Sequence, residues 1–163
     1  MTAGRPSRLP AALIGAGAAI AVAAVGGTLT DLGPWYQSLI KPAWQPPGPV
    51  FGIVWTVIFA LATVSGVAAW RAARRPSTRE WPLALFALNG FLNISWSLLF
   101  FRLRRPDWAL LEVGLFWLSI VALIVWLWRI SRPAGLLLAP YLLWVSIAGV
   151  LNLAIVRLNP AFG

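Results

Sequence analysis

The sequence predicts an all-α integral membrane protein, a bundle of five membrane-spanning helices, and composition is the first of three observations behind this prediction. Of the 163 residues, 60% are hydrophobic and only 10% are charged, and the mean hydropathy is +0.81. Soluble domains are about 45–50% apolar and about 25% charged. A chain this short has too little interior to bury so much apolar surface. The solvent around it is therefore lipid.

The second observation is that charged residues divide the chain into five apolar runs. A helix needs roughly 20 apolar residues to cross a bilayer, and in hydrocarbon the backbone must satisfy its own hydrogen bonds. Each run therefore predicts one helix, and together they form a single membrane domain over residues 1–163. The expected spans are approximately 9–30, 50–70, 81–101, 108–128 and 133–156.

The third observation is the number and placement of tryptophans. The chain has 11 of them, and aromatic side chains near the ends of spans anchor helices at the membrane surface. The tryptophans near run ends are Trp70, Trp81, Trp108, Trp126 and Trp128.

The first run has two interpretations. Arg5 and Arg8 before an apolar stretch, with Ala21-Val22-Ala23 as a cleavage site, fit a secretory signal peptide. However, the run continues to Thr30, and small residues allow two membrane helices to approach closely. A small residue occupies every fourth position, at Ala11, Gly15, Ala19, Ala23 and Gly27. We therefore favour a retained helix that packs against a neighbour along this stripe.

The first loop, residues 31–49, cannot form one continuous helix because proline recurs along it. The interrupting pairs are Gly33-Pro34, Lys41-Pro42, Pro46-Pro47 and Gly48-Pro49. The loop also carries Trp35, Tyr36 and Trp44, which are costly to leave in water. We expect this Pro- and Trp-rich loop to fold back as a lid over the helix ends.

Basic residues outnumber acidic ones by 13 to 4, which gives a net charge of +9. They flank the apolar runs and form no stripe with polar neighbours, so the pattern argues against a nucleic-acid partner and indicates orientation in a bilayer. Eight of them fall on the side of the amino terminus and five on the other side. This bias predicts a multi-pass protein of the cell membrane with a cytoplasmic amino terminus.

The absence of certain residue types limits the reactions and metal sites that this chain can support. The chain has no Cys and no His, which removes thiolate chemistry, the usual general base and the commonest metal ligands. We expect no metal, no required cofactor and no conventional catalytic residue. Glu112 is the one acid inside a run. An acid there is a functional candidate, but we expect it to snorkel or to pair with a nearby arginine.

Aromatic and amide side chains share helical faces on three runs. These faces are Trp55 with Phe59, Asn89 with Asn93, Trp96 and Phe100, and Tyr141 with Trp144, Ala148 and Asn152. Each Asn alone is explained as a link between helices, worth about 0.6 kcal/mol. Trp144 lies in the middle of its run, where an indole N–H needs an acceptor or a ligand. Three such faces together indicate a shared aromatic pocket for a small molecule.

The stretch from Trp35 to Gly48, continued by residues 50–56, resembles the first-loop signature of the translocator protein (TspO/MBR) family. This family is also called the tryptophan-rich sensory proteins or peripheral-type benzodiazepine receptors. Residues 88–101 resemble its third helix and residues 140–159 its fifth. The resemblance covers nearly all of residues 33–159.

This resemblance implies a five-helix bundle, usually a homodimer, that binds porphyrins such as protoporphyrin IX and other flat hydrophobic ligands. Three functions stay open: a receptor that senses or translocates tetrapyrroles, an enzyme that degrades porphyrin in light through pocket tryptophans, and a small-molecule transporter. Carried over by motif, the ligand-binding residues are Tyr36, Pro47, Trp55, Phe59, Asn93, Trp96, Trp144 and Ala148.

Composition also bears on the identity of the ligand. Haem iron needs an axial His, Cys, Met or Tyr, and two of these types are absent. A metal-free tetrapyrrole therefore fits better than a ligated haem, and its propionates need cations at the membrane edge, such as Lys41. The family's sterol consensus requires a Tyr that residues 151–157 lack.

Overall fold

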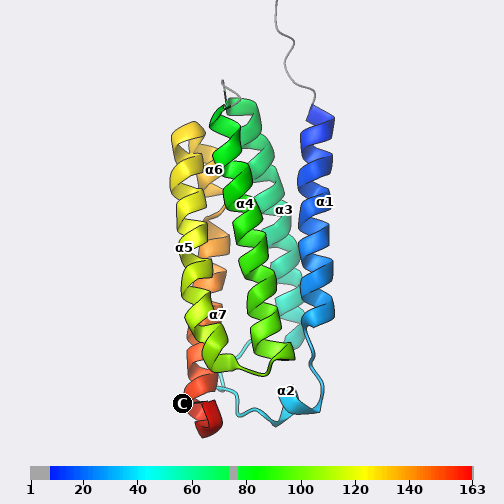
Figure 1. Cartoon of the computed structure of the whole chain (residues 1–163), viewed down its shortest axis with the longest axis vertical. Coiled ribbons are helices and arrows are strands. Elements are labelled where there is room, and N and C mark those ends of the chain that lie inside the picture. The colour runs from blue at the N-terminus through cyan, green and yellow to red at the C-terminus, as the bar shows by residue number, and fades with distance from the viewer. Residues whose placement is uncertain (1–7, 74–76, 163) are drawn as a thin grey trace, which may run out of the picture.

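A computed structural model describes residues 8–73 and 77–162 of the chain. Within these residues, five helical segments are long and apolar enough to cross a membrane (Figure 1). They are α1 (Arg8–Leu29), α3 (Gly48–Ala72), α4 (Ser77–Ser97) continued by the π-helical turn η1 (Leu98–Arg102), α5 (Pro106–Ile130), and α6 (Arg132–Leu136) followed by α7 (Ala139–Leu158). The five-helix membrane bundle is confirmed.

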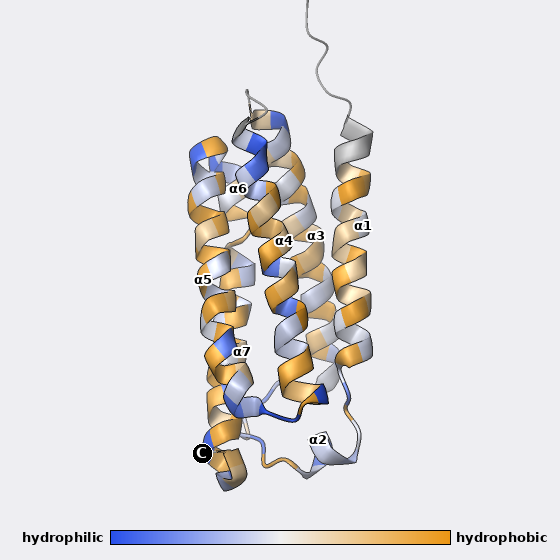
Figure 2. Ribbon diagram, in the orientation of Figure 1, coloured by the Kyte–Doolittle hydropathy of each residue, from blue (hydrophilic) through white to orange (hydrophobic). Residues whose placement is uncertain are grey.

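The helices are packed so that α1 contacts α3 and α4, while α5 contacts α4 and both halves of the fifth span. The helix α3 also contacts α6 and α7. The first loop, the connection from η1 to α5 and the carboxyl terminus lie at one end of the bundle, here called the loop end (Figure 1). The beginnings of α4 and α6 lie at the opposite end. The helices are hydrophobic along their lengths and more hydrophilic at both ends (Figure 2).

The third span begins at Ser77, four residues before the apolar run at Trp81. Its first turn includes Arg79 and Glu80, and a helix can extend beyond the hydrocarbon where water solvates its polar side chains. The acidic Glu80 is also favourable at this position, because the amino-terminal end of a helix carries partial positive charge. The apolar run therefore marks the membrane-crossing part of the helix and not its beginning.

The fifth span is broken between Leu136 and Ala139, although its apolar run predicted one helix. Leu138 donates its N–H to the carbonyl of Gly135 at 3.1 Å, instead of to that of Ala134 four residues back. The buried hydroxyl of Ser65 on α3 donates to the Ala134 carbonyl at 2.7 Å. Side chains of neighbouring helices commonly satisfy backbone groups freed in this way.

The first loop lies across the loop end and includes the short helix α2 (Pro34–Ser38) (Figure 1). Leu39 is buried, and Trp35 packs edge-on against Phe100 and Phe162, with ring centroids 6.1 and 6.5 Å apart. The predicted lid position is therefore confirmed. Trp44, by contrast, is 51% exposed.

The small-residue stripe of α1 faces its neighbours only in part. A side chain at Gly15 would meet Thr63 of α3 at 3.5 Å, whereas one at Gly27 would meet nothing within 4 Å. Each four-residue step overshoots a helical turn of 3.6 residues by about 40°, so the stripe turns away from the bundle. Gly26 takes its place at the loop end, opposite Asn93 and Ser97 of α4.

Candidate functional site

An aromatic cluster, formed by Phe51, Trp55, Trp96, Tyr141 and Trp144, occupies the bundle between α3, α4 and α7. Trp55 packs edge-on against Tyr141 at 6.0 Å, and Phe51 packs edge-on against Trp144 at 5.4 Å. Trp55 also stacks on Phe59 at 5.5 Å. Phe51 and Trp96 belong both to the core of the bundle and to the apolar core beneath the first loop. The cluster therefore connects the middle of the bundle with the lid.

Trp144 differs from Trp96 and Trp117 in its indole N–H. Its side chain is 8% exposed, and among the described residues its Nε1 has no hydrogen-bond acceptor. The Nε1 of Trp96 donates to Asn152 Oδ1 at 3.2 Å, and that of Trp117 donates to Ser146 Oγ at 2.9 Å. A buried donor without a partner costs about 1–3 kcal/mol. Within the described residues, the aromatic cluster therefore contains a buried indole donor that has no partner.

Asn89 connects three helices, and both polar atoms of its side-chain amide already have a protein partner. Its Nδ2 donates to Ser119 Oγ on α5 at 2.8 Å, and its Oδ1 accepts from the Tyr141 hydroxyl on α7 at 2.9 Å. Asn93, one turn further along α4, is also buried. Asn93 also lies opposite Gly26 of α1. Asn89 thus links α4 to α5 and α7, whereas Asn93 lies where α4 faces α1.

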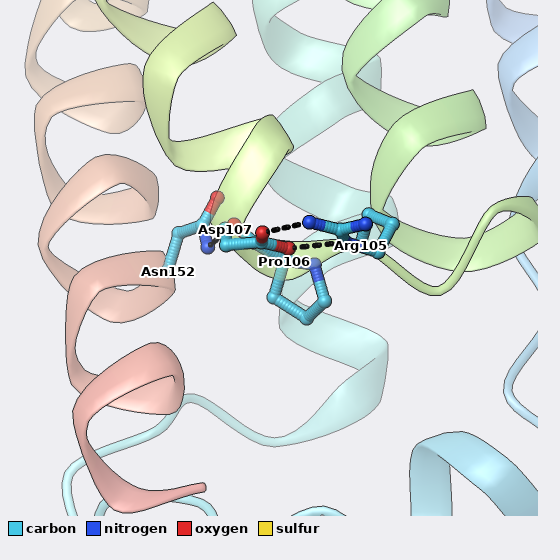
Figure 3. A network of polar contacts seen from close by, with 4 residues as sticks. All are labelled: Arg105, Pro106, Asp107 and Asn152. Carbon is cyan, nitrogen blue, oxygen red and sulfur yellow. Dashed lines mark hydrogen bonds and ion pairs between the residues drawn. The ribbon is translucent and has the colours of Figure 1, made fainter. Parts of the chain in front are cut away.

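Asn152 is a second link between helices, at the loop end. It accepts from Trp96 on α4, and its Nδ2 donates to the carbonyl of Pro106 on α5 at 2.8 Å. Figure 3 shows Asn152 reaching from α7 to the first turn of α5, beside the ion pair of Arg105 and Asp107. This bond fixes the ring of Trp96, which also stacks on Phe100 at 5.1 Å.

The predicted residues of the first loop lie above this cluster. The ring of Tyr36 packs against Phe101 at 5.6 Å, and its hydroxyl accepts from Gln45 Nε2 at 3.2 Å. Burial raises the pKa of Tyr36, which keeps the hydroxyl protonated. The ammonium group of Lys41 lies 4.5 Å from the Tyr36 ring centroid. Pro47 is exposed before α3, and Ala148 is half-buried on α7.

The expectation for Glu112 was wrong. Both of its carboxyl oxygens are buried, and neither has a hydrogen-bond partner among the described residues. The ion pair within the described chain joins Arg105 and Asp107, not Glu112. Among the described residues, Glu112 therefore neither snorkels nor pairs. The side chain can therefore offer hydrogen-bond capacity to a ligand.

Two features of this region were not predicted from the sequence. The π-helical turn η1 places both Phe100 and Phe101 inside, where they pack against each other at 4.8 Å. Such turns occur frequently at functional sites. In addition, a cavity of about 700 Å³ lies between α1, α3 and α4 toward the end opposite the loop. Of the eight predicted ligand-binding residues, Phe59 lines this cavity.

Comparisons with known proteins all relate this chain to the same protein family. Residues 14–158 match the TspO/MBR family. Protein CrtK of Rhodobacter capsulatus is 35% identical over 142 residues, which cover 87% of this chain and 89% of CrtK. Tryptophan-rich protein TspO of Chlorobaculum tepidum is 40% identical over 151 residues, covering 88% of this chain and 92% of that protein. Human translocator protein is 32% identical over 80 residues, 48% of this chain and 47% of its own length. The chain therefore belongs to the TspO/MBR family, and its five apolar helices make it a multi-pass integral membrane protein.

Proposed function

We propose that this protein binds metal-free tetrapyrroles such as protoporphyrin IX, and other flat hydrophobic ligands, against the aromatic cluster beneath the first loop. The observation that carries the proposal is the buried indole N–H of Trp144, which lacks an acceptor among the described residues. A carbonyl or carboxylate oxygen of a bound molecule would be an acceptor of the required kind, while the indole ring itself can stack on a flat macrocycle. The rings of Trp55, Phe51 and Trp96 offer apolar walls for such a molecule.

The unpaired carboxyl group of Glu112 supports the same ligand class. A ligand that brings an N–H or O–H donor to this position would pair with that carboxyl group. At the loop end, the ammonium group of Lys41, which donates to the carbonyls of Gln37 and Leu39, is a cation that would attract the propionates. Relatives named tryptophan-rich sensory protein and translocator protein support a binding or sensing role over conventional catalysis.

The test is a titration of the purified protein with protoporphyrin IX, followed by tryptophan fluorescence in the dark. The expected result is saturable quenching, and Trp144→Phe should weaken the affinity about two- to twelve-fold, the value of one hydrogen bond to a neutral group. Trp128 is 43% exposed near a helix end, so Trp128→Phe is the control and should leave affinity unchanged. An equal loss in both folded variants would refute this site. New absorbing products after illumination would instead support a degrading enzyme.

Two further features stay predictions: a homodimer and a cytoplasmic amino terminus. The start of α1 and the end of α7 lie at opposite ends of the bundle (Figure 1), so the two termini are expected on opposite sides of the membrane. Reporter fusions at Arg5, which lies outside the described residues, and after Arg157 test the orientation. Light scattering of the detergent-solubilised protein tests the dimer.

A further inference from the structure

The cavity between α1, α3 and α4 exists because small residues face one another on all three helices. Its walls include Ala18 and Ala19 of α1, Ala62 and Gly66 of α3, and Ala87 and Gly90 of α4. Its volume of about 700 Å³ lies within the range of about 300–1,000 Å³ that is usual for small-molecule sites. It is bounded by Trp70, Ala73 and Arg79, which places it toward the end of the bundle opposite the first loop.

The interior of this cavity is suited to hydrocarbon. Its polar side chains already bond to the protein: Asn89 bonds to Ser119 and Tyr141, and Thr63 Oγ1 donates to the carbonyl of Phe59 at 2.9 Å. The remaining walls are mainly aliphatic and aromatic. The propionates of a tetrapyrrole would lose their hydrogen bonds in such a place, at a cost for each unpaired group. An acyl chain has no polar group to lose.

The mouth of the cavity carries the guanidinium group of Arg79. This group lies over the ring of Trp70, 4.7 Å from its centroid, and Nη2 donates to the Ala73 carbonyl at 3.3 Å. Its Nε is buried and has no hydrogen-bond partner among the described residues. Arg79 also lies in the first turn of α4, where the helix dipole adds positive potential. The mouth is therefore built for an anionic group with several acceptor oxygens.

We propose that this cavity binds an anionic phospholipid, with an acyl chain between α1, α3 and α4 and its phosphate on Arg79. An arginine binds phosphate through several parallel donors, which a single point charge does not provide. Charge separates the candidate lipids: in phosphatidylcholine the phosphate carries its own cation, whereas phosphatidylglycerol brings a net negative charge to the basic end of the bundle. The cavity adjoins the aromatic cluster at Tyr141, which belongs to both, but Trp144 is not among its walls.

The experiment measures lipid retained by the full-length protein in detergent, by native mass spectrometry, with phosphatidylglycerol and phosphatidylcholine of identical acyl chains. The expected result is about tenfold tighter retention of phosphatidylglycerol, the size of a charge-assisted hydrogen bond. Arg79→Gln should abolish this preference, and Arg79→Lys should restore part of it. Arg71 lies exposed in the last turn of α3 at the same end, so Arg71→Gln is the matched control and should keep the preference.

A second pair of variants tests the position of the acyl chain. Ala62 lines the cavity, whereas Ala60 is exposed on another face of the same helix. Ala62→Leu should reduce retention of phosphatidylglycerol several-fold, and Ala60→Leu should not. The proposal would be overturned if the two lipids were retained equally, or if Arg79→Gln and Ala62→Leu had the same effects as their controls Arg71→Gln and Ala60→Leu.

It would also be overturned if Ala62→Leu spared the lipid and abolished protoporphyrin binding. In that case the lipid site is wrong and the proposed tetrapyrrole function stands. If Trp144→Phe weakens protoporphyrin binding and lipid retention is unchanged, the lipid site stands.

Discussion

The side-chain amide of Asn159 forms two hydrogen bonds with the backbone of Ile40, although 119 residues separate them in the chain. Asn159 Oδ1 accepts from the Ile40 N–H at 3.0 Å, and Nδ2 donates to the Ile40 carbonyl at 2.9 Å. The same Nδ2 also donates to the Ile155 carbonyl at 2.8 Å. The first loop is thereby fastened to the end of α7, directly after the helix that carries Trp144.

We expect Asn159→Leu to open the first loop more often without unfolding the bundle. Ile40 is exposed, so water replaces part of the lost bonding and the cost to the closed loop is about 1 kcal/mol. That corresponds to about fivefold more frequent opening. Cleavage by chymotrypsin after the exposed Trp44 and dissociation of protoporphyrin should accelerate together.

The control for this loop is Gln37→Leu. Gln37 Nε2 donates to the Leu32 carbonyl at 3.1 Å, a contact within the loop that does not fasten it to α7. Its removal should change neither rate appreciably. Unchanged cleavage in Asn159→Leu would show that Leu39 and Trp35, rather than the Asn159 bonds, hold the loop closed.

We expect Ser65→Ala to destabilise the broken fifth span. The Ser65 hydroxyl is the donor to the Ala134 carbonyl, and Ser65 is 0% exposed, so its removal leaves that carbonyl unpaired at a cost of about 1–3 kcal/mol. The free energy of unfolding in detergent, measured with a denaturant series, should fall by this amount. Thr56 is exposed and its hydroxyl bonds to Gly52 in its own helix, so Thr56→Ala should have a much smaller effect.

Two adjacent glycines test how α1 packs. Gly26 is buried opposite Asn93 and Ser97, whereas a side chain at Gly27 would meet nothing within 4 Å. Gly26→Leu should therefore overpack the contact between α1 and α4 and destabilise the bundle by about 1–3 kcal/mol. Gly27→Leu changes the same helix by the same side chain and should leave the unfolding midpoint unchanged. Equal midpoints in both variants would place α1 in a different rotation.

The sequence was sufficient to predict the spans because charges bound them and because hydrocarbon permits few alternatives to a helix. It did not predict the break before Ala139, because hydropathy describes side chains and does not report where backbone hydrogen bonds are interrupted. Pro140 was a local signal of this break. Phe101 was not expected inside because an α-helical spacing excludes it, and only the π-helical turn brings it there. Glu112 was misjudged because its burial depends on which face of α5 the other helices cover.

The aromatic residues of the candidate site were predictable to the extent that they share faces within single helices. Trp55 with Phe59, and Tyr141 with Trp144, lie together as that spacing requires. Contacts between helices were not available from spacing alone, so Phe51 was missed as the partner of Trp144. The cavity was missed for the same reason, because it arises from small residues on three helices at once.

The last prediction concerns Glu112, whose two carboxyl oxygens are buried without partners among the described residues. Replacing an unpaired buried acid with an apolar side chain of similar size removes a desolvation cost. Glu112→Leu should therefore raise the free energy of unfolding by about 1–3 kcal/mol. Such a group persists in a functional site where a ligand pairs with it. The same variant should therefore weaken protoporphyrin binding about tenfold, as expected for a lost charge-assisted bond.

The control is Glu80, which is exposed in the first turn of α4. Glu80→Leu should neither raise the free energy of unfolding nor weaken protoporphyrin binding. A more stable Glu112→Leu variant with unchanged affinity would show that the carboxyl group faces away from the ligand. A less stable variant would show that Glu112 supports the fold itself.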